Sequence, residues 1–371
     1  MKVAIIHDDL MRRGGAEQVV LSMLKAYPKA DLYTLCYRPD LTYPEFKNYR
    51  IKTSIFNYLA NSEKYMKWLF FPFGLLSMKL LKVIGYDIVI ISNTYCAKYA
   101  SIDPSSKIFI YTYTPFRLAW DPTSYKEFNE AKGLKRKLFN VVIKVLKGID
   151  ASESRKGHYF LGMTSETAAR IQKAYNVKQI EIIYPPVKCT NFHISQKTSD
   201  YYLIVTRLEH YKRVDLAIDA FNLLGYNLII VGNGNKKEEL KKRANENIKF
   251  MSGLSKEEIA ELYAGCKAFI FPQHEDYGIT PLEANASGRP VIAYGNGGVL
   301  ETMIPYNDDN PENFTAVFFK EQTVDSLIDA IQKFERLQID PVFIRKHAEK
   351  FDESVFIQNI LKFVNDKMAI L

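Results

Sequence analysis

Residues 268–293 read AFIFPQHEDYGITPLEANASGRPVIA, and this stretch decides the fold. It opens with a short apolar run, Ala268–Phe271, which has the length of a buried strand. A polar loop and a helical stretch at Leu282–Ser287 follow, and a second apolar run occupies Pro290–Ala293. Strand, helix and strand in this order predict two parallel strands joined by a crossover helix.

The loop inside this unit has the chemistry of a phosphate site. Gly278 permits an unusual backbone angle or a close approach to a ligand. Thr280 followed by Pro281 predicts a helix start with a hydroxyl cap, and the amides at such a terminus bind phosphate. Glu283 lies about one turn inside the helix, where its carboxylate can reach ligand hydroxyls. A second interpretation stays open: Glu275 is a loop charge and Glu283 favours the helix dipole.

The same alternation of strands and helices runs outward along the chain. Further runs of strand length are Val3–Ile6, Asp87–Ser92, Lys107–Tyr113, Tyr159–Thr164, Tyr201–Thr206, Leu228–Val231 and Ile248–Phe250. Helical stretches between them are Glu17–Ala26, Glu166–Tyr175, Asp215–Leu223, Lys236–Ala244 and Lys256–Tyr263. Two prolines break the pattern at Tyr184–Val187. We therefore expect two doubly wound α/β domains that join near residue 187.

Length and composition agree with a two-domain globular protein. The chain has 371 residues, of which 47% are hydrophobic and 25% charged. Its longest apolar stretch, Trp68–Met78, contains Pro72 and is shorter than the ~20 residues that span a bilayer. No secretory signal is evident, and the four cysteines form no CxxC pair, which favours reduced, buried thiols in a cytoplasmic protein.

Two further loops carry groups suited to a phosphate ligand. Residues 206–213 read TRLEHYKR, and Arg207 and Lys212 there can clamp a diphosphate. Solvated surface charge explains the same two residues equally well. Gly14 and Gly15 lie between the first predicted strand and a helix, where a glycine pair lets the backbone approach a ligand. Because the pattern is not G-x-G-x-x-G, the nicotinamide fingerprint is absent.

Together these loops resemble glycosyltransferase family 4, the retaining enzymes of the GT-B fold. The two glutamates at Glu275 and Glu283 form the E-x7-E motif that is the hallmark of that family. Other segments agree in order and spacing over nearly the whole chain: Gly14-Gly15, Thr112–Asp121, Ser165, Tyr184–Val187, Arg207 with Lys212, Gly232-Asn233-Gly234 and Gly288–Ile292. The segment Glu275–Ala293 is most similar to mannosyltransferases of bacterial O-antigen and capsule assembly, which use GDP-mannose.

The resemblance implies a fold, a reaction and a set of residues. The fold is GT-B: an acceptor-binding Rossmann-like domain at residues 1–187, joined by a C-terminal helix at about 355–371 that crosses back, and a donor-binding domain at 188–354. The reaction is retaining, metal-independent hexosyl transfer from a nucleotide sugar to a lipid-linked glycan. The implied donor-binding residues are Gly14, Gly15, Arg207, Lys212, Gly253, Glu275, Tyr277, Gly278, Ile279, Thr280 and Glu283.

Within that set the resemblance gives each group a task. Arg207 and Lys212 neutralise the diphosphate in place of a metal, and the amides of residues 278–280 hold the distal phosphate. Glu283 accepts hydrogen bonds from ribose hydroxyls, and Glu275 faces the transferred sugar. Gly253, in the turn at residues 251–254, borders the nucleobase, and the Gly14-Gly15 pair approaches the diphosphate. No cofactor or metal is implied, and the six histidines show no metal-ligand spacing.

One departure from the family concerns Tyr113. The family often has a histidine at this position, beside the reactive carbon of the sugar, and a phenol is no base near neutral pH. Either Tyr113 positions the sugar while the departing phosphate takes the acceptor's proton, or the sugar or acceptor differs from the usual one. A third interpretation is an inactive chain. The implied catalytic residues are Arg207, Lys212, Glu275 and Tyr113.

The basic first half of the chain suggests an anionic partner. The net charge is +8, and the excess of Lys and Arg falls in residues 1–184. Lys64–Lys82 and Lys132–Lys147 mix basic and apolar residues as segments that lie on an anionic membrane do. The opposing interpretation is that their apolar faces belong to the core. We expect a cytoplasmic protein held peripherally at the inner face of the membrane.

Other functions stay open at this stage. The donor could be a UDP-sugar carrying glucose, galactose or N-acetylhexosamine. A nucleotide-sugar epimerase shares the double-Rossmann architecture, but the Glu275/Glu283 spacing argues against it. A nucleic-acid-binding protein would use the basic half, yet no helix-turn-helix, zinc or single-strand-binding signature supports one, so no nucleic-acid partner is expected.

Overall fold

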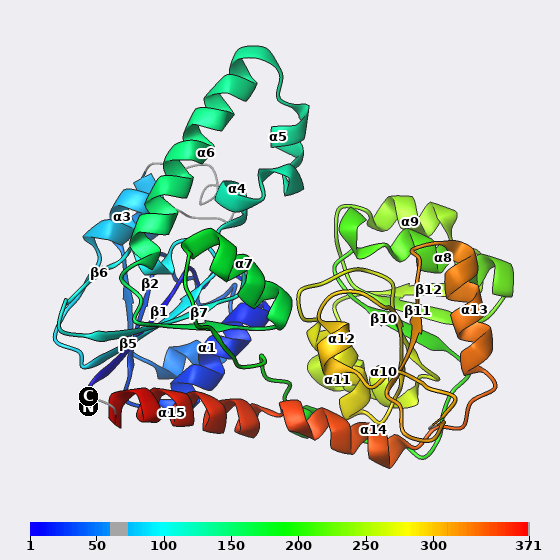
Figure 1. The fold of residues 1–371 in the computed structure, drawn as a ribbon. Coiled ribbons are helices and arrows are strands. Elements are labelled where there is room, and N and C mark those ends of the chain that lie inside the picture. Colours follow the sequence, from blue (N-terminus) through cyan, green and yellow to red (C-terminus); the bar gives the residue numbers. More distant parts are fainter. Residues whose placement is uncertain (60–72, 310, 370–371) are drawn as a thin grey trace. The chain divides into compact units, whose positions relative to one another are not determined.

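The computed structural model describes residues 1–59, 73–309 and 311–369. The chain divides into two compact units (Figure 1): unit 1 comprises Met1–Tyr184 with Phe356–Leu371, and unit 2 comprises Pro185–Val355. Each unit contains a parallel sheet wrapped by helices, as the alternating pattern predicts. Two Rossmann-like units of this kind make up a GT-B fold.

Among the described residues, the sheet of unit 1 has seven strands in the order β3-β2-β1-β5-β7-β8-β9. Their bounds are β1 Val3–His7, β2 Asp31–Thr34, β3 Ile51–Thr53, β5 Ile88–Asn93, β7 Lys107–Thr112, β8 Tyr159–Gly162 and β9 Glu181–Ile182. A separate parallel pair joins β4 Lys82–Val83 to β6 Ser101–Ile102. Because β1 lies between β2 and β5, the strand order reverses there, and ligands of such sheets bind at the carboxyl ends of the strands on either side of the reversal.

The sheet of unit 2 has six parallel strands in the order β12-β11-β10-β13-β14-β15. Their bounds are β10 Tyr202–Val205, β11 Leu228–Val231, β12 Ile248–Met251, β13 Phe269–Phe271, β14 Val291–Tyr294 and β15 Ala316–Phe319. Here the order reverses between β10 and β13, which pair through Leu203 and Phe269. The carboxyl ends of these two strands lead directly into the loops that contain Lys212 and Glu275.

Helices cover both sheets, and several of them begin at a side-chain cap. In unit 1 they are α1 Gly15–Ala26, α3 Leu75–Leu80, α4 Arg117–Trp120, α5 Lys126–Glu130, α6 Gly133–Ser154 and α7 Ser165–Tyr175. In unit 2 they are α8 Val214–Leu224, α9 Lys237–Arg243, α10 Lys256–Gly265, α11 Ile279–Ala286, α12 Val299–Thr302, α13 Val324–Phe334 and α14 Pro341–Ala348. Capping boxes at Thr164 and Ser255 open α7 and α10.

The final helix, α15 (Glu353–Ala369), returns the chain to unit 1. Its Phe356 ring packs edge-on against Tyr111 of β7, with ring centroids 6.1 Å apart. Phe363 makes the same kind of contact with Phe109 at 6.1 Å and Tyr159 at 6.3 Å. Aromatic rings of α15 therefore pack against β7 and β8 in the core of unit 1.

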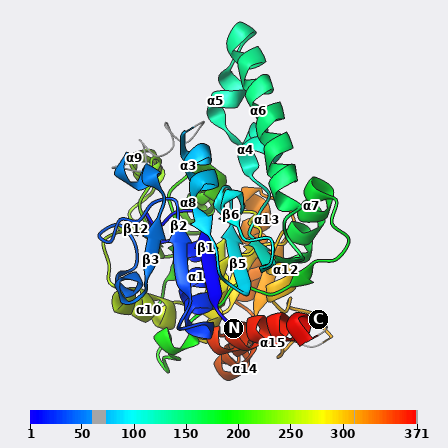
Figure 2. The same cartoon turned by 90° about the vertical axis from the view of Figure 1, so that its left-hand side faces the viewer.

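Helix α6 is anchored at one end and projects at the other. Near its C-terminal end, the buried Asp150 accepts hydrogen bonds from the Lys98 ammonium and the Tyr99 hydroxyl at 2.7 Å each, and from the Trp120 indole at 2.8 Å. Its N-terminal half extends beyond the sheet of unit 1 in both views (Figures 1 and 2). None of the helices in the described residues is long and apolar enough to span a bilayer. The four cysteines are free and buried, as the sequence predicts.

Candidate functional site

The reversal point of unit 2 brings together three loops that the sequence singles out. The loop after β10 carries Arg207 and Lys212, the loop after β13 carries Glu275, and α11 begins immediately afterwards. Gly232 and Gly234 of the loop after β11 pack against the backbone of residues 206 and 208, which leaves no room for a Cβ atom at either glycine. The Leu208 amide also donates to the Asn233 carbonyl at 2.9 Å. The base of the Arg207 loop is therefore fixed by its neighbour.

Two cations lie at this point with different surroundings. Arg207 is exposed, and its guanidinium donates to the Tyr211 hydroxyl at 3.1 Å. Lys212 is mostly buried, lies 5.0 Å from the centroid of the Tyr211 ring, and forms an ion pair with Glu275. Lys212 and Glu275, which are 63 positions apart in the sequence, are thus in direct contact.

The backbone of the Glu275 loop is supported by the turn that follows β14. The Gly298 amide donates to the Glu275 carbonyl at 2.9 Å. A Cβ atom at Gly298 would lie 2.5 Å from both the Asp276 carbonyl oxygen and the Tyr277 Cα. Gly297 has φ +82, a left-handed conformation that glycine adopts without strain. This pair was not predicted, although two adjacent glycines after a strand are the same signal as Gly14 and Gly15.

Helix α11 starts two residues earlier than predicted. Gly278 is its N-cap, with φ +84, and the helix begins at Ile279. The prediction of Thr280 as cap and Pro281 as first helical residue was therefore wrong. Pro281 is still tolerated because it lies in the first turn, where amides have no partner within the helix. The backbone amides of residues 278–280 lie at the N-terminus of this helix, and helix N-termini are in general suited to phosphate; the binding of phosphate here stays a prediction.

Two buried tyrosines form hydrogen bonds within and beside the segment from Glu275 to Glu283. Tyr277 is buried, and its hydroxyl donates to the Pro185 carbonyl at 2.7 Å. The buried Tyr263 hydroxyl, from α10, donates to Glu283 Oε2 at 2.9 Å. Burial raises the pKa of Glu283, and the hydrogen bond from Tyr263 opposes part of that rise. Nothing in the spacing of the motif pointed to Tyr263.

Gly253 lies in the exposed turn after β12, at the edge of the sheet where the strands have their carboxyl ends, as do the loops of Lys212 and Glu275. Its φ of +76 gives the turn a conformation suited to glycine. Next to it, the Ser252 hydroxyl accepts a hydrogen bond from the Lys237 ammonium at 2.9 Å. The assignment of this turn to a nucleobase stays a prediction.

Unit 1 has its own polar cluster at the reversal between β1 and β5. His7 Nδ1 lies 3.0 Å from Ser92 Oγ, which lies 2.9 Å from the Tyr113 hydroxyl. The Tyr113 hydroxyl also donates to the Ala16 carbonyl at 3.2 Å, in the first turn of α1. Burial raises the pKa of Tyr113, so the phenol stays protonated at neutral pH. This geometry suits a positioning group, and the catalytic role of Tyr113 stays a prediction.

Gly14 and Gly15 open α1 beside this cluster. Gly14 is the N-cap, and a Cβ atom there would lie 2.6 Å from Glu17 Oε2. The Glu17 carboxylate lies 4.0 Å from His7 Nε2. Burial lowers the pKa of His7, but the hydrogen bond and charge of Glu17, with Asp8 and Asp9, raise it overall. The approach of the glycine pair to a diphosphate stays a prediction.

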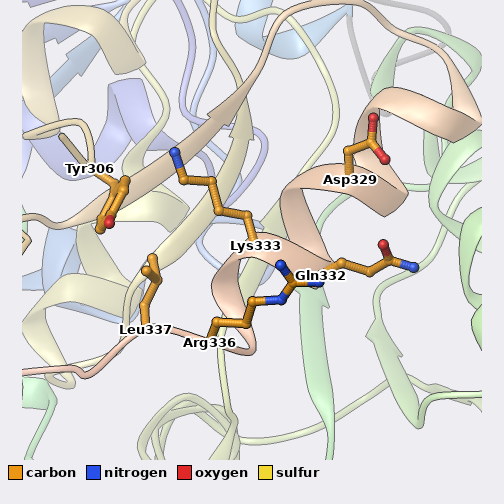
Figure 3. Close-up of a pocket in the computed structure, with 6 residues that line it drawn as sticks. All are labelled: Tyr306, Asp329, Gln332, Lys333, Arg336 and Leu337. Atoms are coloured by element: carbon orange, nitrogen blue, oxygen red, sulfur yellow. The ribbon is translucent and has the colours of Figure 1, made fainter. Parts of the chain in front are cut away.

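Other features of the described residues do not coincide with either cluster. No three His, Cys, Asp or Glu side chains gather in a way that could hold a metal ion there. A surface hollow of about 540 Å³ lies along α13 (Figure 3) and is lined by Tyr306, Asp329, Gln332, Lys333, Arg336 and Leu337. It shares no residue with the reversal point of the unit 2 sheet.

Comparison with known proteins points to one class of enzyme. Residues 190–354 match the family Glycosyl transferases group 1. The chain is 24% identical over 423 aligned residues to the α-1,3/1,6-mannosyltransferase ALG2 of Candida glabrata, covering 94% of this chain and 88% of that protein. Its fold is similar to Anabaena Alr3699/HepE in complex with UDP, with a TM-score of 0.69 and 14% identity over 99% of this chain and 100% of that one. It is also similar to sucrose-phosphate synthase from Thermosynechococcus elongatus, with a TM-score of 0.73 and 13% identity over the whole of both chains.

Proposed function

Since residues 190–354 form a glycosyl transferases group 1 domain within a GT-B chain, this protein is a glycosyltransferase, and we propose that it transfers mannose from GDP-mannose with retention of configuration. The observation that carries the proposal is the grouping of Lys212, Glu275 and the start of α11 at one reversal point of a parallel sheet. In such sheets this is where nucleotides bind.

The proposed chemistry is charge stabilisation on the departing diphosphate. Arg207 and Lys212 neutralise the phosphates, and the amides of residues 278–280 hold the distal one. The two cations make a divalent metal unnecessary. Glu275 and Glu283 come from adjoining segments of one loop and helix, so they bind donor hydroxyls and do not flank the scissile bond as the carboxylates of glycosidases do.

Mannose is the favoured sugar because the matched relative is a mannosyltransferase and the Glu275–Ala293 segment resembles enzymes that use GDP-mannose. The second candidate is a UDP-sugar, since Alr3699/HepE of the same fold binds UDP. For the acceptor we propose a lipid-linked glycan in bacterial surface polysaccharide synthesis. In this proposal the protein binds peripherally to the inner face of the membrane, where it reaches the lipid-linked acceptor.

A panel of nucleotide sugars tests the donor directly. We expect slow hydrolysis of GDP-mannose in the absence of acceptor, faster than that of UDP-sugars, and no loss of rate with a chelator. The α-configuration of the product by NMR would establish retention. Faster turnover of a UDP-sugar would transfer the assignment to the second candidate.

The Glu283→Ala variant tests the site. It removes hydrogen bonds to a charged group, so GDP binding measured by calorimetry should weaken roughly 10-fold to 100-fold. Glu261→Ala is the matched control, because Glu261 is an exposed glutamate on the neighbouring α10. Unchanged GDP affinity in Glu283→Ala would show that the ribose assignment is wrong.

A further inference from the structure

Lys212 and Glu275 are assigned to different parts of the donor, yet they contact each other. The proposed function gives Lys212 to the diphosphate and Glu275 to the sugar. In the structure the Lys212 ammonium is ion-paired with Glu275 Oε1, and the two side chains are only 12% and 23% exposed. A pair so shielded from water is screened less than a surface pair, so it holds the lysine more firmly.

A diphosphate and the Glu275 carboxylate therefore compete for the same ammonium. The phosphate oxygens carry more charge than a carboxylate, and Arg207 and the α11 amides assist them. When Lys212 turns to the diphosphate, Glu275 loses its counter-ion. It then becomes an anionic acceptor for the hydroxyls of the sugar on that same diphosphate.

Gln273 is placed to hold the carboxylate during this exchange. Its Nε2 lies 3.4 Å from Glu275 Oε1, the atom that also pairs with Lys212. Gln273 is 2% exposed, and its Oε1 is buried without a hydrogen-bond partner among the described residues. Burying an amide costs free energy, and the contact of its Nε2 with the Glu275 carboxylate offsets part of that cost. The backbone of Glu275 is held separately by Gly298, so only the side chain needs to change partner.

We propose that the Lys212–Glu275 ion pair is an exchange contact: the diphosphate takes Lys212, and Glu275, positioned by Gln273, is released to bind the sugar. The inference rests on the proposed function and adds Gln273 as a positioning residue. Under this proposal, the Glu275 side chain weakens the binding of the nucleotide and promotes the transfer of the sugar. A residue that merely supported the fold would not affect these two steps in opposite directions.

Calorimetry with GDP and UDP, which lack the sugar, tests the competition. Glu275→Gln and Glu275→Ala both remove the competing charge, so each should bind the preferred nucleotide roughly threefold to tenfold more tightly than wild type. The gain should shrink in high salt. Their turnover of the sugar donor should fall at the same time. Asp219→Asn is the control, because it breaks the Arg243–Asp219 ion pair on α8 and α9 and should change neither measurement.

Gln273→Met tests the positioning role with a side chain of similar shape. Nucleotide affinity should stay at the wild-type value while kcat/KM for the sugar donor falls, and Gln273→Asn should restore part of the loss. Unchanged or weaker nucleotide binding in both Glu275 variants would overturn the proposal, as would wild-type kcat/KM in Gln273→Met. Failure of the wild-type protein to bind either nucleotide would instead contradict the proposed function itself.

Discussion

At the scale of single residues, Glu283 shows how its surroundings set the protonation of a buried carboxylate. Burial raises its pKa, because a charged carboxylate loses hydration inside the protein. The Tyr263 hydroxyl donates to it at 2.9 Å and stabilises the charged form. Only the ionised carboxylate can accept hydrogen bonds from both ribose hydroxyls without donating one. Nucleotide affinity should therefore fall as the pH drops through the raised pKa.

The Tyr263→Phe variant should move that loss to higher pH. Without the hydroxyl, nothing from Tyr263 opposes the effect of burial, so the pKa of Glu283 rises further and protonation begins closer to neutrality. GDP titrations over the acidic range would measure the midpoint. Affinity well above the midpoint should change less than the midpoint does. A midpoint that stays in place in Tyr263→Phe would separate the pH dependence from Glu283.

At the scale of elements, the sequence predicts those helices and strands whose own residues carry a clear hydrophobic pattern. The strand Leu228–Val231 has its predicted bounds, and a helix, α11, follows the Glu275 loop as predicted. The short strands β2 and β3 were missed, because their few residues carry no periodicity of their own; β2 depends on pairing with β1, and β3 on pairing with β2. The start of α11 at Ile279 follows from the positive φ of its N-cap, Gly278, whereas the prediction from the sequence relied on the helix-start signal of Thr280 and Pro281.

Some residues of the candidate site could likewise be predicted from the sequence, and others could not. Glu275 and Glu283 could be predicted because they lie in one motif. Tyr263 and Gln273 could not, because their contacts with those glutamates arise only when strands and helices pack. The Lys212–Glu275 pair is likewise invisible in the sequence, since each loop was assigned a different part of the donor.

The turn after β14 gives a prediction at the same scale. In Gly298→Ala the added Cβ meets backbone atoms of Asp276 and Tyr277 at 2.5 Å, and backbone cannot yield as a flexible side chain does. We expect a loss of about 1–3 kcal/mol in the free energy of unfolding and weaker GDP binding. Gly148→Ala on α6 is the control: its Cβ meets nothing within 4 Å, so it should be neutral or slightly stabilising. Equal behaviour of the two variants would show that the turn does not hold the Glu275 loop.

At the scale of the whole molecule, the first half of the chain carries the excess of basic residues. Helix α6, which belongs to this half, also has exposed apolar side chains. Leu134, Leu138, Val141 and Val145 are 83%, 64%, 60% and 47% exposed and recur at helical spacing, so they share one face. Leu146 is fully buried, and Val142 packs against the core, so the core interpretation is confirmed for these two residues, which lie on the adjacent face of the helix. Lys64, Lys67, Trp68, Phe70 and Phe71 of the other predicted segment lie outside the described residues.

The exposed face of α6 matches an anionic bilayer in both chemistry and charge. Lys135, Lys137 and Lys144 are exposed beside the apolar residues of this face. Arg136 does not join them freely, because its guanidinium lies 3.6 Å from the centroid of the Phe128 ring and donates to the Phe128 carbonyl. The protein can therefore place both hydrophobic and electrostatic contacts on one lipid surface.

Vesicle binding tests this match. Leu138→Ser with Val141→Ser should lower co-sedimentation with phosphatidylglycerol vesicles by roughly tenfold or more at any salt concentration, because apolar contacts are not screened. Lys135→Glu with Lys137→Glu should lower it mainly at low salt. Leu223→Ser, at a 72% exposed position on α8, controls for the loss of exposed apolar area and should bind as wild type. These side chains have few contacts to lose, so unfolding temperatures should change little. Wild-type vesicle binding in both double variants would exclude α6 as the membrane-facing element and leave the basic half of the chain to another anionic partner.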